Sequence, residues 1–419
     1  MLTLSTSVAS FAWATASSIH QAIVMLQPDW EATNAQLMAV SFAFVFIWMS
    51  LAAFRLEDIT WIYLGGAAIL FVHFIIYVIA LPVTHATQHQ PWASGKDAFG
   101  NYTNYSDWNR AVAVPFTFFT SIWTNSAWSA PAYIVESTHN GRSSAARAVV
   151  DSYLVTAVGG VVVCVIAAFC IPNMDDAAAD PSGYPLFTMI QTHFGTKCTA
   201  AFLLIPACVT GLGGSAQTLS YGSQIAAFAR DGGVPFSNVL SRVDQRVNMP
   251  VPAILSLGVA SCLVLLFALS SVASQIIYSL STIAYLLTMG LPNWLRLFAG
   301  DRWVPGPFNY GRWSKPIYLL AGLGQLWLAV MESFPPEREW TASTLNYSWC
   351  LTLGVIIFAM ILYRFLGKNY TGPDFEALEH YRHDLVEGLA PTHSVQERDV
   401  DDDVQAFKGP NVKTSDDDS

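Results

Sequence analysis

The stretch VGGVVVCVIAAFCI, residues 158–171, decides the fold class of this protein. Its side chains are apolar or small, and they follow one another without the polar–apolar alternation of a barrel strand. In apolar surroundings a helix satisfies its backbone hydrogen bonds within itself, which an isolated extended segment cannot do. The stretch therefore predicts a helix that is surrounded by protein or lipid.

The composition of the whole chain agrees with this prediction. Of the 419 residues, 53% are hydrophobic and 12% are charged, whereas a soluble domain carries about 25% charged residues. The net charge is −10, but residues 369–419 alone contain 13 Asp and Glu against 4 Lys and Arg. The body of the chain is therefore close to neutral and apolar enough to have lipid as its solvent.

Ten apolar stretches approach the length of about 20 helical residues that crosses a bilayer. They predict an all-α, polytopic membrane protein with about ten transmembrane helices in residues 1–368. The acidic segment 369–419 is predicted to be a largely disordered cytoplasmic tail. The first stretch is rich in Ser, Thr and Ala, which favours a helix buried against other helices. The predicted spans are residues 3–26, 36–54, 59–82, 112–134, 148–171, 199–228, 251–270, 274–295, 316–333 and 347–366.

The basic residues between the spans predict the orientation. If the first helix runs outward, the inner connections hold twelve Lys and Arg residues and the outer connections hold four. Because positively charged loops favour the cytoplasm, the C-terminus is predicted to be cytoplasmic. The sequons at Asn101, Asn104 and Asn346 then all fall outside, where glycosylation could occur.

The fourth span contains a polar interruption, IWTNSAWSAP, at residues 122–131. Asn125 and Ser126 compete for backbone hydrogen bonds, and Pro131 removes a donor. We expect a local unwinding near Asn125, which would leave backbone groups free to bind a solute within the membrane. The alternative is a proline-kinked helix whose Ser and Asn side chains are satisfied locally. The residues predicted to bind substrate are Trp123, Thr124, Asn125, Ser126, Ala127 and Trp128.

Three further features inside the spans have both a structural and a functional interpretation. The glycine-rich segment 210–217, TGLGGSAQ, could line a cavity, but close helix packing is favoured. His20 and His73 could relay protons, but a neutral, hydrogen-bonded role is favoured for single histidines. The eighth span has a polar face that includes Thr282 and Tyr285, which is either core packing or the wall of a site.

Several functional classes are excluded by missing patterns. Gly-x-Ser-x-Gly and His-Glu-x-x-His are absent, so the sequence predicts no enzyme and no catalytic residue. The six cysteines show no CxxC pair and no metal spacing, so neither a metal site nor a cofactor is predicted. Without a basic stripe, nucleic acid is not expected as a partner.

Residues 228–237, FARDGGVPFS, resemble the amino acid–polyamine–organocation (APC) transporters, and most of all the fungal branch with GABA and choline permeases. This resemblance implies two inverted five-helix repeats followed by two helices, and a solute site between the broken first and sixth helices. The ten spans here would be the third to the twelfth, so the break near Asn125 would be that of the sixth helix. Further matching stretches are residues 180–185, 243–246, 249–254, 279–284, 306–313 and 333–336.

The resemblance leads to two alternative hypotheses. The first is secondary active transport of a small amino compound (an amino acid, GABA, choline or a polyamine), with protons as the implied coupling ion and the plasma membrane as the implied location. The lipid bilayer and the solute are then its partners. However, the first two family helices are not matched, and segment 125–127 has no glycine where the family has a glycine-rich break. The second hypothesis is therefore an N-terminally truncated, non-transporting remnant that acts as a sensor or scaffold.

Overall fold

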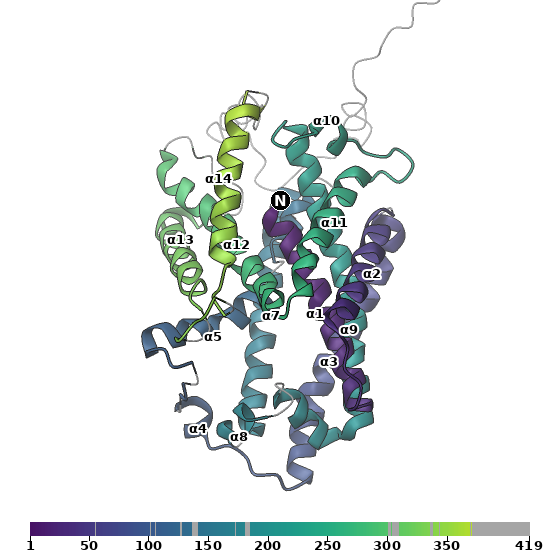
Figure 1. Ribbon diagram of the computed structural model, residues 1–419, viewed down its shortest axis with the longest axis vertical. Helices are drawn as coiled ribbons and strands as arrows, with labels where there is room; N and C mark the ends of the chain where they lie inside the picture. The colour runs from purple at the N-terminus through teal and green to yellow at the C-terminus, as the bar shows by residue number, and fades with distance from the viewer. Residues whose placement is uncertain are drawn as a thin grey trace, which may run out of the picture.

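A computed structural model describes residues 1–54, 56–100, 102–104, 106–125, 128–135, 141–171, 173–180, 185–300, 303, 310–335, 338–342, 344–368 and 370. These residues are almost entirely helical (Figure 1). They contain no strand, only an isolated bridge between Asp244 and Met249. The predicted all-α fold class is confirmed. The sequon at Asn101 and the predicted tail, apart from Tyr370, lie outside the described residues.

Helical structure is found at each of the ten predicted spans, and the fourth span is divided between two helices. Figure 1 shows α4 and α8 at one end of the bundle and α10 at the other. The helices are α1 (Leu2–Leu26), α2 (Asn34–Ala52), α3 (Leu56–Thr87), α4 (Gly95–Gly100), α5 (Arg110–Thr124), α6 (Ala130–Tyr133), α7 (Gly141–Cys170), α8 (Met174–Ala178), α9 (Pro185–Arg230), α10 (Ser237–Leu240), α11 (Val251–Leu265), η2 (Leu266–Leu269), α12 (Ser271–Phe298), η4 (Gly311–Trp313), α13 (Ser314–Met331) and α14 (Ser348–Leu366).

Some helices are longer than the apolar stretches that predicted them. The span predicted at 59–82 extends to Thr87 in α3, whereas α9 runs from Pro185 but is interrupted at Gly195, shortly before the span predicted at 199–228. The predicted end of the span at 59–82 was wrong, because a helix continues beyond the hydrocarbon core as long as its backbone remains bonded.

By length and composition, six helical segments of the described chain could cross a membrane: Asn34–Ala52, Asp58–Thr87, Ser144–Cys170, Leu186–Arg230, Val251–Leu269 and Ser348–Phe365. Their outer faces are apolar: Phe71 on α3, Val155 on α7 and Met360 on α14 are all exposed. Such a surface has lipid as its natural solvent. Helix α1 is less apolar because it contains many Ser, Thr and Ala residues, and most of these side chains are buried among other helices.

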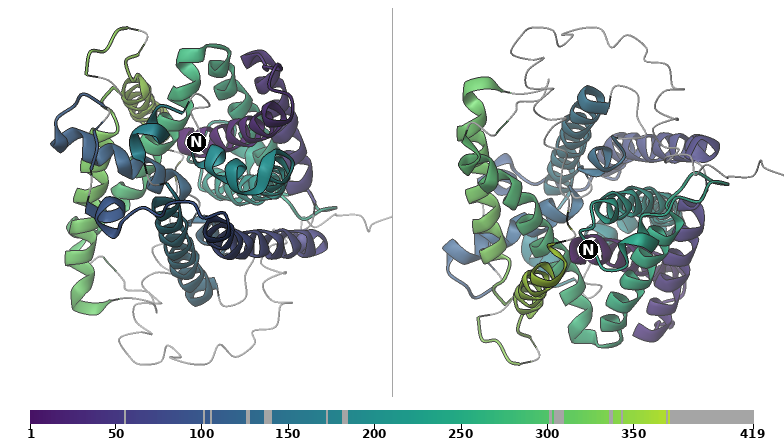
Figure 2. Two further views of the ribbon diagram at one scale, coloured as in Figure 1. Left: turned by 90° about the horizontal axis from the view of Figure 1, so that it is seen from below. Right: turned by 90° about the horizontal axis from the view of Figure 1, so that it is seen from above.

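Helix α1 lies near the centre of the bundle, as its small residues predict (Figure 2). It packs against α2, α9, α11 and α12. Val8 and Ala12 of α1 share one apolar core with Trp48 of α2, Tyr221 of α9 and Leu257 of α11. The small side chains of α1 let four neighbouring helices approach its backbone.

The glycines of α9 serve close packing, which confirms the favoured interpretation of segment 210–217. A Cβ atom on Gly214 would lie 2.3 Å from ring atoms of Trp48, and one on Gly211 would lie 3.4 Å from Phe44. The same helix is interrupted at Gly195, where φ is 72° and ψ is 163°. Glycine accepts this left-handed φ without the steric penalty of a Cβ atom. Helix α9 therefore consists of a short first segment and a long second segment.

Candidate substrate site at the break between α5 and α6

The chain leaves the helical path in the fourth span. Helix α5 ends at Thr124, and Asn125 follows with φ −90° and ψ 14° while its N–H bonds to the carbonyl of Ser121. Helix α6 begins only at Ala130, with Ser129 as its N-cap residue and Pro131 in its first turn. The predicted interruption near Asn125 is therefore present, and the proline stands after it, where a helix tolerates the missing donor.

The residues predicted to bind substrate lie at this break, and they differ in exposure. Trp123, Thr124, Asn125 and Trp128 are described, whereas Ser126 and Ala127 lie outside the described residues. The Thr124 side chain is exposed, and its hydroxyl donates to the carbonyl of Thr120 at 2.8 Å. Trp123, Asn125 and Trp128 are each partly buried.

A hydroxyl cluster connects the break to the helices behind it. Ser129 Oγ, just before α6, lies 3.3 Å from the hydroxyl of Tyr285 on α12. The ring of Tyr133 packs edge-on against Tyr221 of α9, with the centroids 5.7 Å apart. Helix α6 is thus attached to α12 before its first residue and to α9 at its last residue.

The cluster continues through a buried amide to α1. Gln217 Nε2 donates to Ser7 Oγ at 2.8 Å and to the hydroxyl of Tyr221 at 3.2 Å. Ser7 Oγ and the Tyr221 hydroxyl are themselves 3.5 Å apart. We call these six residues, Ser7, Ser129, Tyr133, Gln217, Tyr221 and Tyr285, the polar cluster. It joins α1, α6, α9 and α12.

Two amides, Asn125 at the break and Gln217 in the polar cluster, use only one of their two polar atoms. Asn125 Nδ2 donates to the carbonyl of Ser121 at 2.9 Å, but Asn125 Oδ1 is buried and accepts no hydrogen bond from the described residues. The same holds for Gln217 Oε1. Both protein partners of Gln217 are hydroxyls bonded to one amide atom, so the other atom lacks a partner whichever way the amide is oriented. A buried unpaired acceptor costs about 1–3 kcal/mol, which a ligand with N–H donors would recover.

Aromatic rings surround the break. Trp123 packs edge-on against Tyr278 of α12, with centroids 5.6 Å apart, and lies 6.5 Å from Phe11 of α1. Trp128 packs edge-on against Tyr285 at 6.1 Å. Such rings provide an apolar wall and negative faces that attract a cation. The polar cluster itself consists of neutral side chains, so the arrangement is suited to binding rather than to acid–base chemistry.

Sequence reasoning found only part of this site. Tyr285 was assigned to the polar face of its span and Gln217 belongs to the glycine-rich segment, but neither was connected to Asn125. Ser7, Tyr133 and Tyr221 give no signal beyond being polar residues in apolar helices. A buried polar residue in a membrane helix is a common packing feature, so only the spatial convergence distinguishes these residues.

The histidines considered in the sequence lie elsewhere. His20 Nε2 accepts a hydrogen bond from the backbone N–H of Ala32 at 3.1 Å, and its ring packs on Trp30. This contact is the hydrogen-bonded role favoured for a single histidine in a span. The ring of His73 packs at a tilt against that of Phe202, with the centroids 3.8 Å apart.

Tyr285→Phe tests the attachment of the break to α12. The substitution removes the hydroxyl bonded to Ser129, and we expect the free energy of unfolding to fall by about 1 kcal/mol. The melting midpoint of the detergent-solubilised protein, followed by tryptophan fluorescence, measures this. Tyr363→Phe, at an exposed ring on α14, is the matched control and should leave the midpoint unchanged. Equal midpoints for the two variants would show that the Ser129 contact contributes nothing.

Comparison with known proteins identifies the family. The family profile described as amino acid permease matches residues 1–358. The chain belongs to the amino acid permease family. Together with its apolar helices, this makes it a polytopic integral membrane protein, and it confirms the resemblance found in segment 228–237.

Individual permeases are similar over much of this chain. The GABA-specific permease of Saccharomyces cerevisiae is 30% identical over 304 residues, which cover 71% of this chain and 53% of that protein. An uncharacterized amino-acid permease of Schizosaccharomyces pombe is 26% identical over 370 residues, or 85% and 66% of the two chains. A putative amino acid/polyamine transporter of Macrophomina phaseolina is 26% identical over 258 residues, or 60% and 57%. These relatives are named as permeases or transporters, and this chain spans between about half and two thirds of their length.

Proposed function

We propose that this permease-family protein moves a small amino compound across its membrane by secondary active transport, with the solute bound at the break between α5 and α6. The observation that carries the proposal is that two buried amide oxygens, Asn125 Oδ1 and Gln217 Oε1, have no hydrogen-bond partner among the described residues. A primary ammonium group brings three N–H donors and a positive charge. It would satisfy such acceptors, and the rings of Trp123 and Tyr278 would pack against its charge or its carbon chain.

The same chemistry discriminates among the amino compounds that the family resemblance suggests. Amino acids, GABA and polyamines all carry N–H donors, whereas choline has a quaternary nitrogen without any. Choline would leave both amide oxygens unpaired, at a cost of about 1–3 kcal/mol for each. We therefore favour a solute with a primary amine. The name of the similar Saccharomyces protein, GABA-specific permease, supports this choice.

The remaining parts of the proposal concern the transport cycle. The interruption between α5 and α6 supports alternating access, because a broken helix lets its two halves tilt separately around a solute. The excess of basic residues on one side supports a cytoplasmic C-terminus. Coupling to protons and location in the plasma membrane are inferred from the APC resemblance alone.

Reconstitution of the full chain tests the proposal. Proteoliposomes with an inward proton gradient should accumulate at least one of radiolabelled GABA, alanine or putrescine about tenfold above empty liposomes, and choline much less. A protonophore should abolish the accumulation. Saturable binding of one of these amines without any uptake would instead support the sensor or scaffold hypothesis. If none of these amines is bound or taken up, the result would contradict an amine site.

A further inference from the structure

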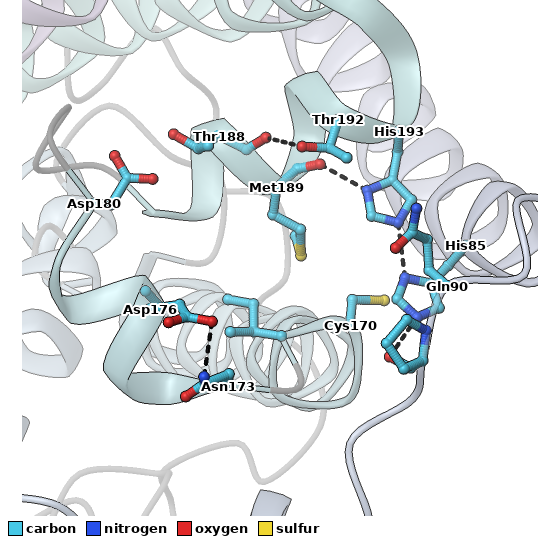
Figure 3. A pocket seen from close by; sticks show the side chains of 13 residues that line it. His85, Gln90, Cys170, Asn173, Asp176, Asp180, Thr188, Met189, Thr192 and His193 are labelled. Carbon is cyan, nitrogen blue, oxygen red and sulfur yellow. Dashed lines mark hydrogen bonds between the residues drawn. The ribbon is translucent and has the colours of Figure 1, made fainter.

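Two histidines connect α3 to α9 beside a cavity that α8 also lines (Figure 3). His85 Nδ1 lies 2.7 Å from His193 Nε2, and the two rings stack with centroids 4.9 Å apart. His193 Nδ1 lies 2.7 Å from the carbonyl oxygen of Met189, and His85 Nε2 lies 3.2 Å from that of Pro91. Both side chains are buried, with exposed fractions of 1% and 7%. The four ring nitrogens thus form three links between two carbonyl groups.

The number of protons in these links depends on the charge of the pair. A carbonyl oxygen only accepts, so the outer links require N–H groups at His193 Nδ1 and His85 Nε2. The link between the rings requires a third proton. Two neutral imidazoles supply two N–H groups, which leaves one link without a proton. A pair with one additional proton completes all three links, whereas a doubly protonated pair would place two N–H donors against each other.

The surroundings of the pair can stabilise one positive charge. The two histidines line a cavity of about 350 Å³, and Figure 3 shows Asp176 and Asp180 across it. The ring of Trp92 lies 4.3 Å from the ring of His85 and offers it an aromatic face. The carbonyl oxygens of Met189 and Pro91, which accept from the outer ring nitrogens, and this aromatic face offset part of the desolvation of a buried cation. The titratable groups that face the pair are Cys170 from α7, Asp176 from α8 and Asp180 from the connection to α9.

Other charged groups near the pair do not share its cavity. His89 in the turn after α3 and Lys197 on the second segment of α9 are both exposed. Among the described residues, no three His, Cys, Asp or Glu side chains converge in a way that could hold a metal ion. A proton is therefore the cation that this geometry suits.

We propose that the His85–His193 pair is a proton-binding site that holds α3 to the first segment of α9 while it carries one shared proton. Gly195, which interrupts α9, follows His193 by two residues, so the pair lies on the short segment just before the break. Gln88 Nε2 donates to the carbonyl of His193 at 3.0 Å and provides a second connection between the same helices. Loss of the shared proton removes one of the three links and loosens this segment. The site depends neither on the identity of a solute nor on transport.

The linkage between proton binding and stability has a defined sign. A site that binds a proton more tightly in the folded than in the unfolded state stabilises the fold at low pH, and this stabilisation is lost as the pH rises. In detergent, the unchanged full chain should therefore have a higher melting midpoint than His193→Gln, and the difference should be largest at pH 5.5. The difference should shrink by about 2 °C for each pH unit toward pH 8. His85→Gln should behave in the same way.

The control and a direct measurement complete the test. His89→Gln, at the exposed turn, should follow the unchanged protein at every pH. In addition, ¹⁵N spectra of histidine-labelled protein at pH 6 measure the protonation of the pair directly. His85 and His193 are assigned by the signals that His85→Gln and His193→Gln remove. Of the four ring nitrogens in these two residues, three should be protonated. Two protonated nitrogens at this pH would overturn the proposal. So would a difference in melting midpoint that is independent of pH or that grows as the pH rises.

Discussion

Replacing Gln217 with methionine is expected to raise the KM for amine uptake about 10- to 100-fold. Methionine keeps the volume and flexibility of glutamine but removes Oε1, the buried acceptor that has no partner in the part of the chain that the structure describes. A hydrogen bond to a charged group is worth about 1.5–3 kcal/mol, which corresponds to this change in affinity. The effect belongs on KM because the contact is made to the bound solute, while the chain's turnover can remain similar. Concentration-dependent uptake into proteoliposomes measures it.

The fold should tolerate this substitution. Ser7 Oγ and the Tyr221 hydroxyl lie 3.5 Å apart and can bond to each other once the amide is gone. Gln224→Met is the matched control, because Gln224 lies on the same helix and also has a buried oxygen without a partner among the described residues. It lies two helical turns, about 10 Å, from Gln217. If both variants lose uptake equally, Gln217 is not a specific solute contact. The same conclusion follows if Gln217→Met lowers the melting midpoint so far that loss of folded protein accounts for the loss of uptake.

Replacing Gly214 with leucine is expected to destabilise the fold by about 3 kcal/mol, and more if Trp48 cannot move. A Cβ atom at this position would already lie 2.3 Å from ring atoms of Trp48. The Trp48 ring is itself enclosed, since its exposed fraction is 1% and Phe11 and Phe44 lie 5.9 and 6.0 Å away. Because α2 and α9 meet at this point, the helices would have to separate. The yield of monodisperse protein and its melting midpoint should both fall sharply.

The same substitution elsewhere provides the control. At Gly160 on α7 a Cβ atom would meet nothing within 4 Å, so Gly160→Leu should leave the midpoint unchanged or raise it, given the low helix propensity of glycine. Trp48→Ala should partly rescue Gly214→Leu by removing the ring in contact. A Gly214→Leu protein as stable as the unchanged chain would show that α2 and α9 do not pack as closely as described.

Much of the architecture followed from local sequence. The apolar run at 158–171 and its counterparts predicted helices at all ten positions where the structure has them, because hydropathy acts on each segment separately. The interruption at Asn125 was predictable for a similar reason, since Asn and Pro act on the backbone within a few residues. The packing role of segment 210–217 also followed from the small size of its glycines.

Pairs of distant residues required the tertiary structure. His85 and His193 are 108 positions apart, and both lie beyond the spans that hydropathy predicted, so the sequence directed attention to His20 and His73 instead. Gln217 and Ser7 are separated by 210 positions, and nothing local distinguishes them from other polar residues in apolar helices.

The sequence by itself therefore determined that this chain forms apolar helices, that they belong in lipid, and that the fourth one breaks near Asn125. Only the tertiary structure decided which polar groups meet behind that break and which histidines share a hydrogen-bond chain. The physical reason is that burial of apolar surface depends on composition along a segment, whereas a hydrogen bond requires two particular atoms to come within about 3 Å.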